Sequence, residues 1–465
     1  MSSALIYQPV HQLSEQIQSR KLSPVDLVDA YLDNIRQKDQ KLQAFVDVYD
    51  EDARLAAKAA DEAIRSGHSV GPLHGIPIAL KDLIEMEGKI VTGGCEAWRN
   101  RVATRTSTLA RKLISQGMIV LGKTHTVEFA MGGWGTNTRM GTPWNPWDPS
   151  RKRTPGGSSS GSGVAVSAGL SPWAIGTDTG GSVRLPASWC GITGLKTTVG
   201  RVSLYGILPL STTLDTPGPM TTCVEDAAIL YHAMQGHDPL DPKTNIVPGY
   251  IDPMPGLKRG VKGLKLARMP EAERQFTSPD VLQAYDASLA EMEKLGAEIV
   301  PIKLPFAFAD VALWNLRIMA AESYTLLHEL IDNPNSPLDP HVRPRIEPGR
   351  TLTAREYIEA LYQRDLMKVQ FAKAMEGIDA ILTPTTMTTA VPVDEVDQTK
   401  APAHFTRFGN YLDLCGLALP NGQDHQGLPT SLQITCRGYD EDLALRIGWA
   451  YQHATTWHLR RPPAA

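Results

Sequence analysis

The chain has 465 residues, with 46 Lys and Arg against 50 Asp and Glu and a net charge of −4. This near balance argues against a polybasic nucleic-acid-binding protein, and 42% hydrophobic with 21% charged residues argues against a disordered chain. Length alone, at about 150 residues per domain, predicts about three domains.

The predicted elements alternate between helices and strands along the chain. Ser23 and Pro24 form a typical helix start, with a capping hydroxyl and a proline at the first helical position. Periodic apolar residues predict helices over residues 24–35, 52–66, 106–117, 279–295, 353–376 and 440–453. Short apolar runs predict strands over residues 75–80, 118–121, 264–268, 297–302 and 378–384. This alternation is typical of an α/β fold with a mixed, largely buried sheet.

The cysteines and histidines follow no metal-binding or redox pattern. The five cysteines include no C-x-x-C pair, and the twelve histidines include no H-E-x-x-H motif. We therefore expect reduced thiols, no metal site and no cofactor. The N-terminus lacks a basic secretory region, and no run reaches the ~20 apolar residues of a spanning helix. We expect a cytoplasmic protein that does not enter the membrane.

Residues 131–220 are rich in Gly, Ser, Thr and Pro, with eleven glycines from Gly156 to Gly200. A linker can have this composition, but apolar groups such as those at 164–166 and 173–175 interrupt the stretch. Small side chains packed tightly around a site explain the pattern better. The clusters at residues 154–163 and 176–184 are the candidates for that site.

Two common interpretations of such clusters fit poorly. A phosphate-binding loop needs G-x-x-x-x-G-K-[ST] or G-x-G-x-x-G, and neither occurs in the two clusters. A nucleophile elbow, G-x-S-x-G, does occur at residues 157–161 and would make Ser159 the nucleophile. However, residues 150–155 would have to form the preceding strand, and their Arg, Lys and Pro residues make a poor one.

A third interpretation joins both clusters to Lys81. A serine hydroxyl needs a nearby base, and a lysine can serve if burial lowers its pKa enough to leave it neutral. Lys81 ends an apolar run that would bury it, whereas Asp82 alternates to the opposite side of a continuing strand. The small residues of 179–182 let backbone N–H groups converge and stabilise an oxyanion. On its own, however, a lysine after a strand is more often a solvated surface residue.

Three segments together resemble the amidase signature family: residues 75–82 with Lys81, residues 156–162, and residues 176–184. Further similar segments follow in the family's order at 124–131, 186–191, 194–197 and 427–429, with Leu432 and Gln433. The resemblance covers nearly the whole chain and is weakest from about 235 to 375.

The resemblance implies an α/β fold with one large domain, residues 1–465, in place of three. A central mixed β-sheet of many strands would be covered by helices on both faces. The catalytic core would span residues 70–230, and a variable substrate entrance would span residues 250–345.

The resemblance also implies a Ser-Ser-Lys triad in place of Ser-His-Asp. Ser182 would be the nucleophile, Ser158 the bridging serine on a cis peptide bond, and Lys81 the base. The backbone N–H groups of the oxyanion hole would be those of Thr179, Gly180, Gly181 and Ser182. The residues expected to brace the two turns are Ser160, Asp178 and Arg184. The residues expected to contact the substrate are Met131, Gly132, Trp134 and Trp189. The residues expected to form the wall of the substrate entrance are Trp314, Arg317, Met319, Tyr324 and His328.

The implied function is hydrolysis of the C–N bond of a small or aryl carboxamide through a covalent acyl-enzyme, with carbamates and ureas as related substrates. The alternative is the glutamine-hydrolysing subunit of a tRNA-dependent amidotransferase. Those subunits carry a segment similar to Ala-Glu-Ala-Ser-Ser-Asn-Leu, and residues 321–327 of this chain depart from it. A non-enzymatic binding protein is disfavoured because all three triad positions carry the required residues.

The expected partners are a small-molecule amide substrate and water. We expect neither a nucleic acid nor a membrane as a partner. A homodimer, the commonest assembly of soluble enzymes, is the expected oligomer.

Overall fold

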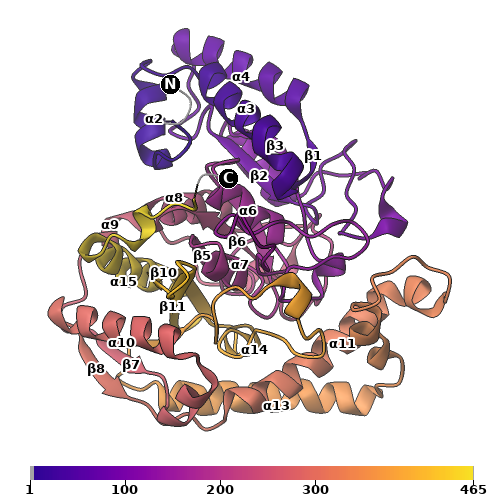
Figure 1. Ribbon diagram of the computed structural model, residues 1–465, viewed down its shortest axis with the longest axis vertical. Helices are drawn as coiled ribbons and strands as arrows, with labels where there is room; N and C mark the ends of the chain where they lie inside the picture. The colour runs from indigo at the N-terminus through magenta and orange to yellow at the C-terminus, as the bar shows by residue number, and fades with distance from the viewer. Residues whose placement is uncertain (1–4, 464–465) are drawn as a thin grey trace.

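One mixed β-sheet of eleven strands runs through the structure, a computed structural model that describes residues 5–463 (Figure 1). The strands are β1 (Phe45–Val48), β2 (Pro77–Lys81), β3 (Ile119–Thr124), β4 (Ala174–Asp178), β5 (Thr193–Lys196), β6 (Thr216–Thr221), β7 (Lys265–Arg268), β8 (Glu298–Pro301), β9 (Ala380–Pro384), β10 (Cys415–Gln423) and β11 (Pro429–Cys436). Their order in the sheet is β1-β3-β2-β4-β6-β5-β10-β11-β9-β7-β8. β2 pairs in parallel with β3 and β4, and β7 with β8 and β9, while the other pairs are antiparallel.

Helices cover both faces of this sheet. They are α2 (Val10–Gln18), α3 (Pro24–Leu42), α4 (Asp50–Arg65), α5 (Thr108–Ser115), α6 (Ser160–Ser167), α7 (Arg184–Trp189), α8 (Val224–Met234), α9 (Met254–Leu257), α10 (Pro279–Lys294), α11 (Phe308–Asp332), α12 (Arg343–Ile346), α13 (Ala354–Ala374), α14 (Arg407–Tyr411) and α15 (Glu441–Ala454). α6 and α7 pack on each other and on one face, whereas α8, α10 and α15 cover the other. α11 packs against α12, α13 and α14 at the side of the molecule opposite α2 (Figure 1).

Helix α3 shows how the sequence sets a local element. The Ser23 hydroxyl accepts a hydrogen bond from the backbone N–H of Val25 at 3.1 Å, and Pro24 occupies the first helical position. Leu27 and Tyr31 lie one turn apart on the buried face. The cap fixes where the helix begins, and the apolar stripe fixes which face turns inward.

The predictions from periodicity are confirmed in the outer parts of the fold, with shifted ends: α3, α4, α5, α10, α13 and α15, and β2, β3, β7, β8 and β9. The middle of the sheet, from β4 to β11, is not predicted by the sequence patterns. β6 reads Thr-Pro-Gly-Pro-Met-Thr and is buried at every residue. A Cβ on Gly218 of β6 would lie 2.0 Å from the carbonyl oxygen of Leu195, so β6 needs glycine to approach β5.

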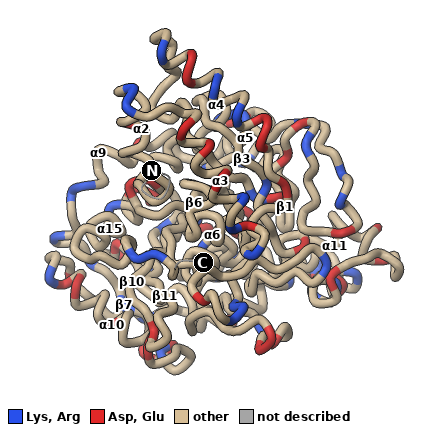
Figure 2. Tube along the Cα trace, turned by 45° about the horizontal axis from the view of Figure 1, so that its top comes forward, with Lys and Arg blue, Asp and Glu red and all other residues tan. Residues whose placement is uncertain are grey.

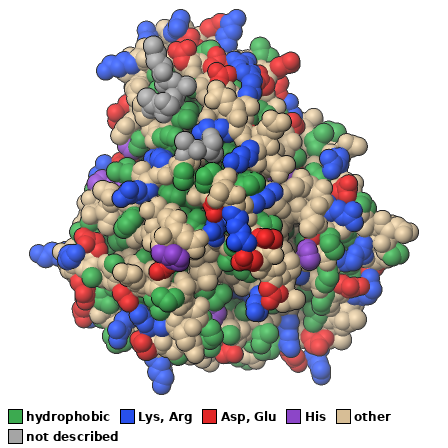
Figure 3. Space-filling model, viewed as in Figure 1, with side chains coloured by type: hydrophobic (Ala, Val, Ile, Leu, Met, Phe, Trp, Pro, Cys, Tyr) green, Lys and Arg blue, Asp and Glu red, His purple; other side chains and the backbone are tan. Residues whose placement is uncertain are grey.

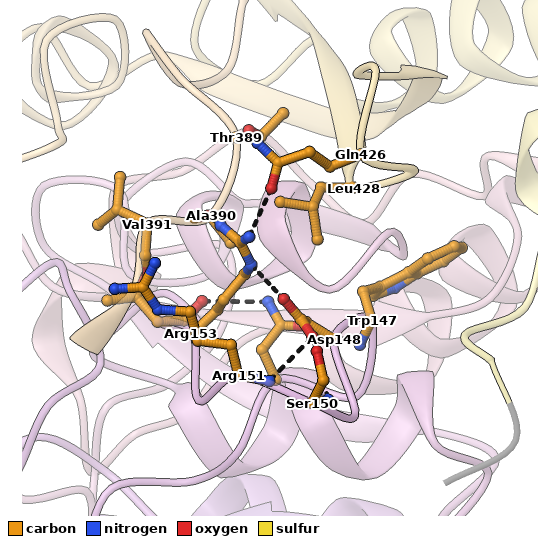
Figure 4. A network of polar contacts seen from close by, with 12 residues as sticks. Trp147, Asp148, Ser150, Arg151, Arg153, Thr389, Ala390, Val391, Gln426 and Leu428 are labelled. Atoms are coloured by element: carbon orange, nitrogen blue, oxygen red, sulfur yellow. Dashed lines mark hydrogen bonds and ion pairs between the residues drawn. The ribbon is translucent and has the colours of Figure 1, made fainter. Parts of the chain in front are cut away.

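A network of polar contacts fixes the chain that leads into residues 154–163 (Figure 4). The Arg153 guanidinium donates to the carboxylate of Asp148 at 2.7 Å. It also donates to the carbonyl oxygen of Ala390 at 3.0 Å and to Oε1 of Gln426 at 2.6 Å. The loop before the serine cluster is thereby tied to the chain that follows β9 and to the turn between β10 and β11.

Charged side chains are spread over the molecule. Lys and Arg lie among Asp and Glu around the periphery of the trace in Figure 2, and both signs are interspersed on the face drawn in Figure 3. Within residues 5–463, none of the helices combines the length and the apolar character that a bilayer crossing requires.

Gly161, near the start of α6, packs directly against neighbouring backbone: a Cβ on it would lie 2.2 Å from the carbonyl oxygen of Ala44 and 2.3 Å from the N of His125. We predict that Gly161→Ala lowers the free energy of unfolding by ~1–3 kcal/mol, as overpacking does, and lowers the midpoint of thermal unfolding. The matched control is Gly256→Ala, where a Cβ has nothing within 4 Å and the midpoint should stay at the wild-type value or rise slightly. An unchanged midpoint for Gly161→Ala would contradict this packing.

Candidate active site

Lys81 is the last residue of β2, and its side chain is fully buried. Its Nζ donates to the Oγ of Ser158 at 2.7 Å and to the Oγ1 of Thr177 at 2.8 Å. β4 pairs directly with β2, which brings Thr177 beside the lysine. Within residues 5–463, Lys81 forms no ion pair, so its side-chain partners are two hydroxyl groups.

The surroundings of Lys81 favour its neutral form. Burial lowers the pKa of Lys81 to about 7, against the opposing negative charges of Asp215 and Asp178. The neighbouring Asp82 is engaged elsewhere, because its carboxylate accepts a hydrogen bond from the backbone N–H of Thr92 at 3.1 Å. A large fraction of Lys81 is therefore neutral near pH 7, as a general base requires.

Ser158 follows a cis peptide bond from Gly157, in agreement with the resemblance. The carbonyl oxygen of Ser158 accepts hydrogen bonds from the backbone N–H groups of Val127 at 3.1 Å and Ser160 at 2.8 Å. The Ser158 side chain is fully buried. The backbone of Ser158 thus holds the turn in place, while the Ser158 hydroxyl faces Lys81.

Ser159, the alternative nucleophile, is held by the backbone of β4. Its Oγ donates to the carbonyl oxygen of Thr177 and accepts from the N–H of Thr177, each at 3.2 Å, and the side chain is fully buried. In the described chain, no strand lies between Thr124, where β3 ends, and Ser159. The nucleophile-elbow interpretation is wrong, since both the preceding strand and the accessible hydroxyl are missing.

Ser182 lies in a turn whose shape is set by Asp178. The Asp178 carboxylate accepts hydrogen bonds from the backbone N–H of Gly181 at 2.7 Å and of Val183 at 3.1 Å. The turn residues whose backbone N–H groups find no acceptor within residues 5–463 are Thr179, Gly180 and Ser182. The N–H of Gly181 is committed to Asp178 and is not free for an oxyanion, in contrast to the expectation from the sequence.

Asp178 is in turn held by Arg184 of α7. The Arg184 guanidinium donates to both Asp178 oxygens, each at 3.0 Å, and to Oδ1 of Asn410 at 2.7 Å. Burial opposes ionisation, but Arg184 together with the charge of Lys196 and the hydrogen bond from Asn410 outweighs it and holds the pKa of Asp178 well below its usual range. Ser160 donates to the carbonyl oxygen of His125 at 3.4 Å. These contacts agree with the bracing role expected for Ser160, Asp178 and Arg184.

The two turns contact each other, and the turn that carries Ser182 lines a small cavity. The backbone N–H of Ser159 donates to the carbonyl oxygen of Ser182 at 3.3 Å, which joins the turns. In the described chain, no hydrogen bond links the hydroxyls of Ser158 and Ser182. Ser182 lines a cavity of about 70 Å³, and so do Met131 and Gly132, two of the expected substrate contacts.

Trp134 and Trp189 do not line this cavity. Their rings stack on each other with centroids 5.5 Å apart. The Trp134 indole donates to the carbonyl oxygen of Lys400 at 2.9 Å, and the Trp189 indole donates to that of Thr388 at 2.8 Å. Because Trp189 is fully buried and both indole N–H groups are engaged, the expected substrate contacts of these residues find no support in the cavity.

Helix α11 forms part of the wall expected from residues 250–345. Leu316 and Met319 line the cavity, and Leu316 also lines a neighbouring groove of about 500 Å³ together with Arg317. The expected wall residues that line neither are Trp314, Tyr324 and His328. Residues 400–407, outside the expected segment, complete the cavity.

Three polar residues of the site cannot be identified as site residues from the sequence alone: Thr177, Arg345 and Arg407. Thr177 is one of several threonines near the two clusters, and only its place in β4 brings it to Lys81. Arg345 and Arg407 lie far along the chain, among 46 basic residues, and reach the cavity only through the fold.

Two groups of side chains place metal-binding atoms within 4.8 Å of one another: His11, Cys223 and Asp226, and Asp280, Asp424 and His425. Burial raises the pKa of the Cys223 thiol, and Asp226 accepts a hydrogen bond from the backbone N–H of Val10 at 2.8 Å. In the second group, His425 bonds Asp280 at 2.7 Å. Neither group lines the cavity that contains Ser182.

The comparisons with known proteins agree with this geometry. The amidase family profile matches residues 26–445. The chain is 35% identical to a glutamyl-tRNA(Gln) amidotransferase subunit of Trichlorobacter lovleyi, over 98% of this chain and 99% of that protein. It is 37% identical to an amidase of Pseudomonas putida, over 99% of this chain and 98% of that protein. The solved peptide amidase of Stenotrophomonas maltophilia has a TM-score of 0.85 at 29% identity, covering 98% of each chain. The chain therefore belongs to the amidase signature family and is an amide-hydrolysing enzyme.

Proposed function

We propose that this enzyme hydrolyses a small or aryl carboxamide through an acyl-enzyme on Ser182, with Ser158 and Lys81 as the proton relay. The contact of 2.7 Å between Lys81 Nζ and Ser158 Oγ, in a fully buried setting, carries the proposal. Neutral Lys81 accepts the proton of Ser158 while Ser158 accepts the proton of Ser182. The Ser182 oxygen then bonds to the carbonyl carbon, and the C=O π electrons move to the carbonyl oxygen.

The resulting oxyanion needs hydrogen-bond donors that are free in the resting enzyme. The backbone N–H groups of Thr179, Gly180 and Ser182 meet this condition within the described chain. A preorganised donor of this kind contributes about 3–4 kcal/mol to transition-state stabilisation in other enzymes. The turn braced by Asp178 thus holds both the nucleophile and the oxyanion donors.

Breakdown of the intermediate returns the proton, because an amine is a poor leaving group unless it is protonated. The Lys81 ammonium passes a proton through Ser158 to the departing nitrogen, the C–N bond breaks, and ammonia or an amine leaves. Water then attacks the acyl-enzyme and gives its proton to the same relay. The carboxylic acid leaves, and the Ser182 hydroxyl is restored.

A second candidate function is glutamine hydrolysis for a tRNA-dependent amidotransferase. Relatives described as subunits of glutamyl-tRNA(Gln) amidotransferases support it. The same three residues would release ammonia from glutamine for a partner protein. Residues 321–327 of α11 differ from the corresponding segment expected in such subunits. This difference favours a stand-alone amidase.

We predict that Ser182→Ala abolishes hydrolysis and that Lys81→Ala and Ser158→Ala each lower kcat by about 10³-fold or more, because each removes a step of the relay. Ser159→Ala is the matched control and should keep its activity, because the Ser159 hydroxyl is bound to the backbone of Thr177. Ammonia or amine release from a panel of aliphatic amides, aryl amides, anilides, carbamates and ureas is the measurement. Near-normal turnover by Lys81→Ala would contradict the triad.

The pH profile should report the buried lysine. Since only neutral Lys81 accepts a proton, kcat/KM should rise with pH through an apparent pKa of about 7 and level off above it. The pKa is depressed, so activity is lost as the pH falls and not as it rises. The substrate must have no titratable group in this range. An inflection near the usual lysine value of about 10 would contradict the proposal.

The two candidate functions differ in their need for partners. We predict that amide hydrolysis does not change when the other subunits of a glutamyl-tRNA(Gln) amidotransferase are added. Ammonia release from glutamine, measured with and without those subunits, is the test. Glutaminase activity that appears only with the partners would support the amidotransferase function instead.

A further inference from the structure

The cavity that contains Ser182 has an unbalanced charge. Arg345, Lys400 and Arg407 line it, and no Asp or Glu side chain is among its lining residues. Lys400 is exposed and lies 3.4 Å from the carboxylate of Asp397, so it is paired. The two arginines have no such partner.

Arg407 is the first residue of α14, and its side chain makes no hydrogen bond or ion pair within residues 5–463. It lies beside the oxyanion turn, because a Cβ on Gly180 would be 3.6 Å from Cγ of Arg407 and 4.0 Å from its Nε. Burial, together with the positive charge of Arg345, lowers the pKa of Arg407 to about 10. A guanidinium in this position remains charged at neutral pH and has its hydrogen-bond donors free.

Arg345 is bonded to neutral oxygens only. It donates to the carbonyl oxygen of Met131 at 2.9 Å and to the carbonyl and side-chain oxygens of Gln398 at 2.8 and 3.0 Å. These contacts fix the guanidinium at the cavity wall without neutralising it. Arg345 and Arg407 together therefore present positive charge to any molecule that enters.

The carboxylates that lie close to the cavity wall are already engaged. Asp215 accepts hydrogen bonds from the hydroxyl of Thr179 and from the backbone N–H of Leu210 at 2.8 Å. Glu322 accepts from the Tyr357 hydroxyl at 2.7 Å and from the backbone and side chain of Thr213. Asp339, whose negative charge acts on Arg345, accepts hydrogen bonds from the backbone N–H groups of Thr138 at 2.7 Å and His341 at 2.8 Å. None of these three carboxylates is hydrogen-bonded to an arginine of the cavity.

Asn315 of α11 adds an independent observation. It is fully buried, yet neither its Nδ2 nor its Oδ1 has a hydrogen-bond partner within residues 5–463. Its Oδ1 would lie 3.9 Å from a Cβ on Gly180, beside Arg407. A buried amide without partners is costly, and this one lies next to the cavity wall although it is not itself among the lining residues.

We propose that the substrate is the monoamide of a short dicarboxylic acid, whose free carboxylate binds Arg407 and Arg345 while its amide lies at Ser182. This inference rests on the proposed amide hydrolysis at Ser182. Guanidinium and carboxylate groups form strong, charge-assisted hydrogen bonds. Because Arg407 lies beside Gly180 of the turn that carries Ser182, a short chain is enough to connect the amide to the carboxylate.

The same charges disfavour glutamine as the substrate. Glutamine has the amide and the carboxylate of such a monoamide, but it also carries an α-ammonium group. That cation would lie in a cavity whose charged lining residues are all basic. The enzyme should therefore prefer glutaramate, which is glutamine without its amino group, to glutamine itself.

The test compares glutaramate with glutamine and with 5-methylhexanamide, in which an uncharged isopropyl group replaces the carboxylate. The wild-type kcat/KM should be about 10–100-fold higher for glutaramate than for either of the others. Arg407→Met should lower kcat/KM for glutaramate by a similar factor, mainly through KM, and should lower kcat/KM for 5-methylhexanamide much less. Arg407→Lys should recover part of the loss. Arg65→Met removes one exposed arginine from the end of α4, which lines neither the cavity nor the neighbouring groove, and should leave kcat/KM for both substrates unchanged.

Equal kcat/KM for glutaramate and 5-methylhexanamide, or an equal effect of Arg407→Met on both, would overturn the inference and leave amide hydrolysis intact. Calorimetric titration of glutaramate into Ser182→Ala separates this outcome from a failure of the proposed function. Binding that disappears in Ser182→Ala/Arg407→Met supports charge recognition whether or not turnover occurs. Binding that is unchanged in the double variant contradicts it.

Discussion

Lys81 occupies a position where a charged ammonium group is costly, since it is fully buried and its side-chain partners are hydroxyl groups. In such surroundings a lysine lowers its free energy by losing its proton. The fold creates these surroundings from distant segments: β2 carries Lys81, the parallel neighbour β4 carries Thr177, and the turn before α6 carries Ser158. The proposed chemistry depends on the neutral amine that results, because a charged lysine could not start the relay.

A buried ion pair helps to place the second turn of the site. Arg184 links Asp178, in the turn that carries Ser182, to Asn410 of α14 and Gln433 of β11. Removing one partner of such a buried pair leaves the other charge uncompensated, which is strongly destabilising. The C-terminal quarter of the chain is therefore needed to hold the nucleophile, and α14 also presents the cation that we assign to substrate binding.

The sequence predicts several outer elements of this fold, though not the edge strand β1 or the 25-residue helix α11, and it predicts none of the strands at its centre. Apolar periodicity marks α10 and α13 clearly, whereas β6 is built from Gly, Pro and Thr, whose role is to allow close approach of neighbouring backbone. At the site, the one nucleophile motif that matches locally is the elbow at Ser159, which fits poorly, and the family resemblance is needed to select Ser158 and Ser182. The approach of Arg407 to Gly180 depends on a contact between distant segments, which no local pattern encodes.

The protonation state of Lys81 can be measured directly by NMR on protein labelled with ¹³C at the lysine Cε position. The Lys81 signal is identified by its absence from the spectrum of Lys81→Met, which also separates it from the buried Lys123 and Lys196. We predict that this signal titrates with a pKa of about 7 in the resting enzyme. A signal that titrates in the usual lysine range, about 10, would contradict the account, because the base would then be charged under working conditions.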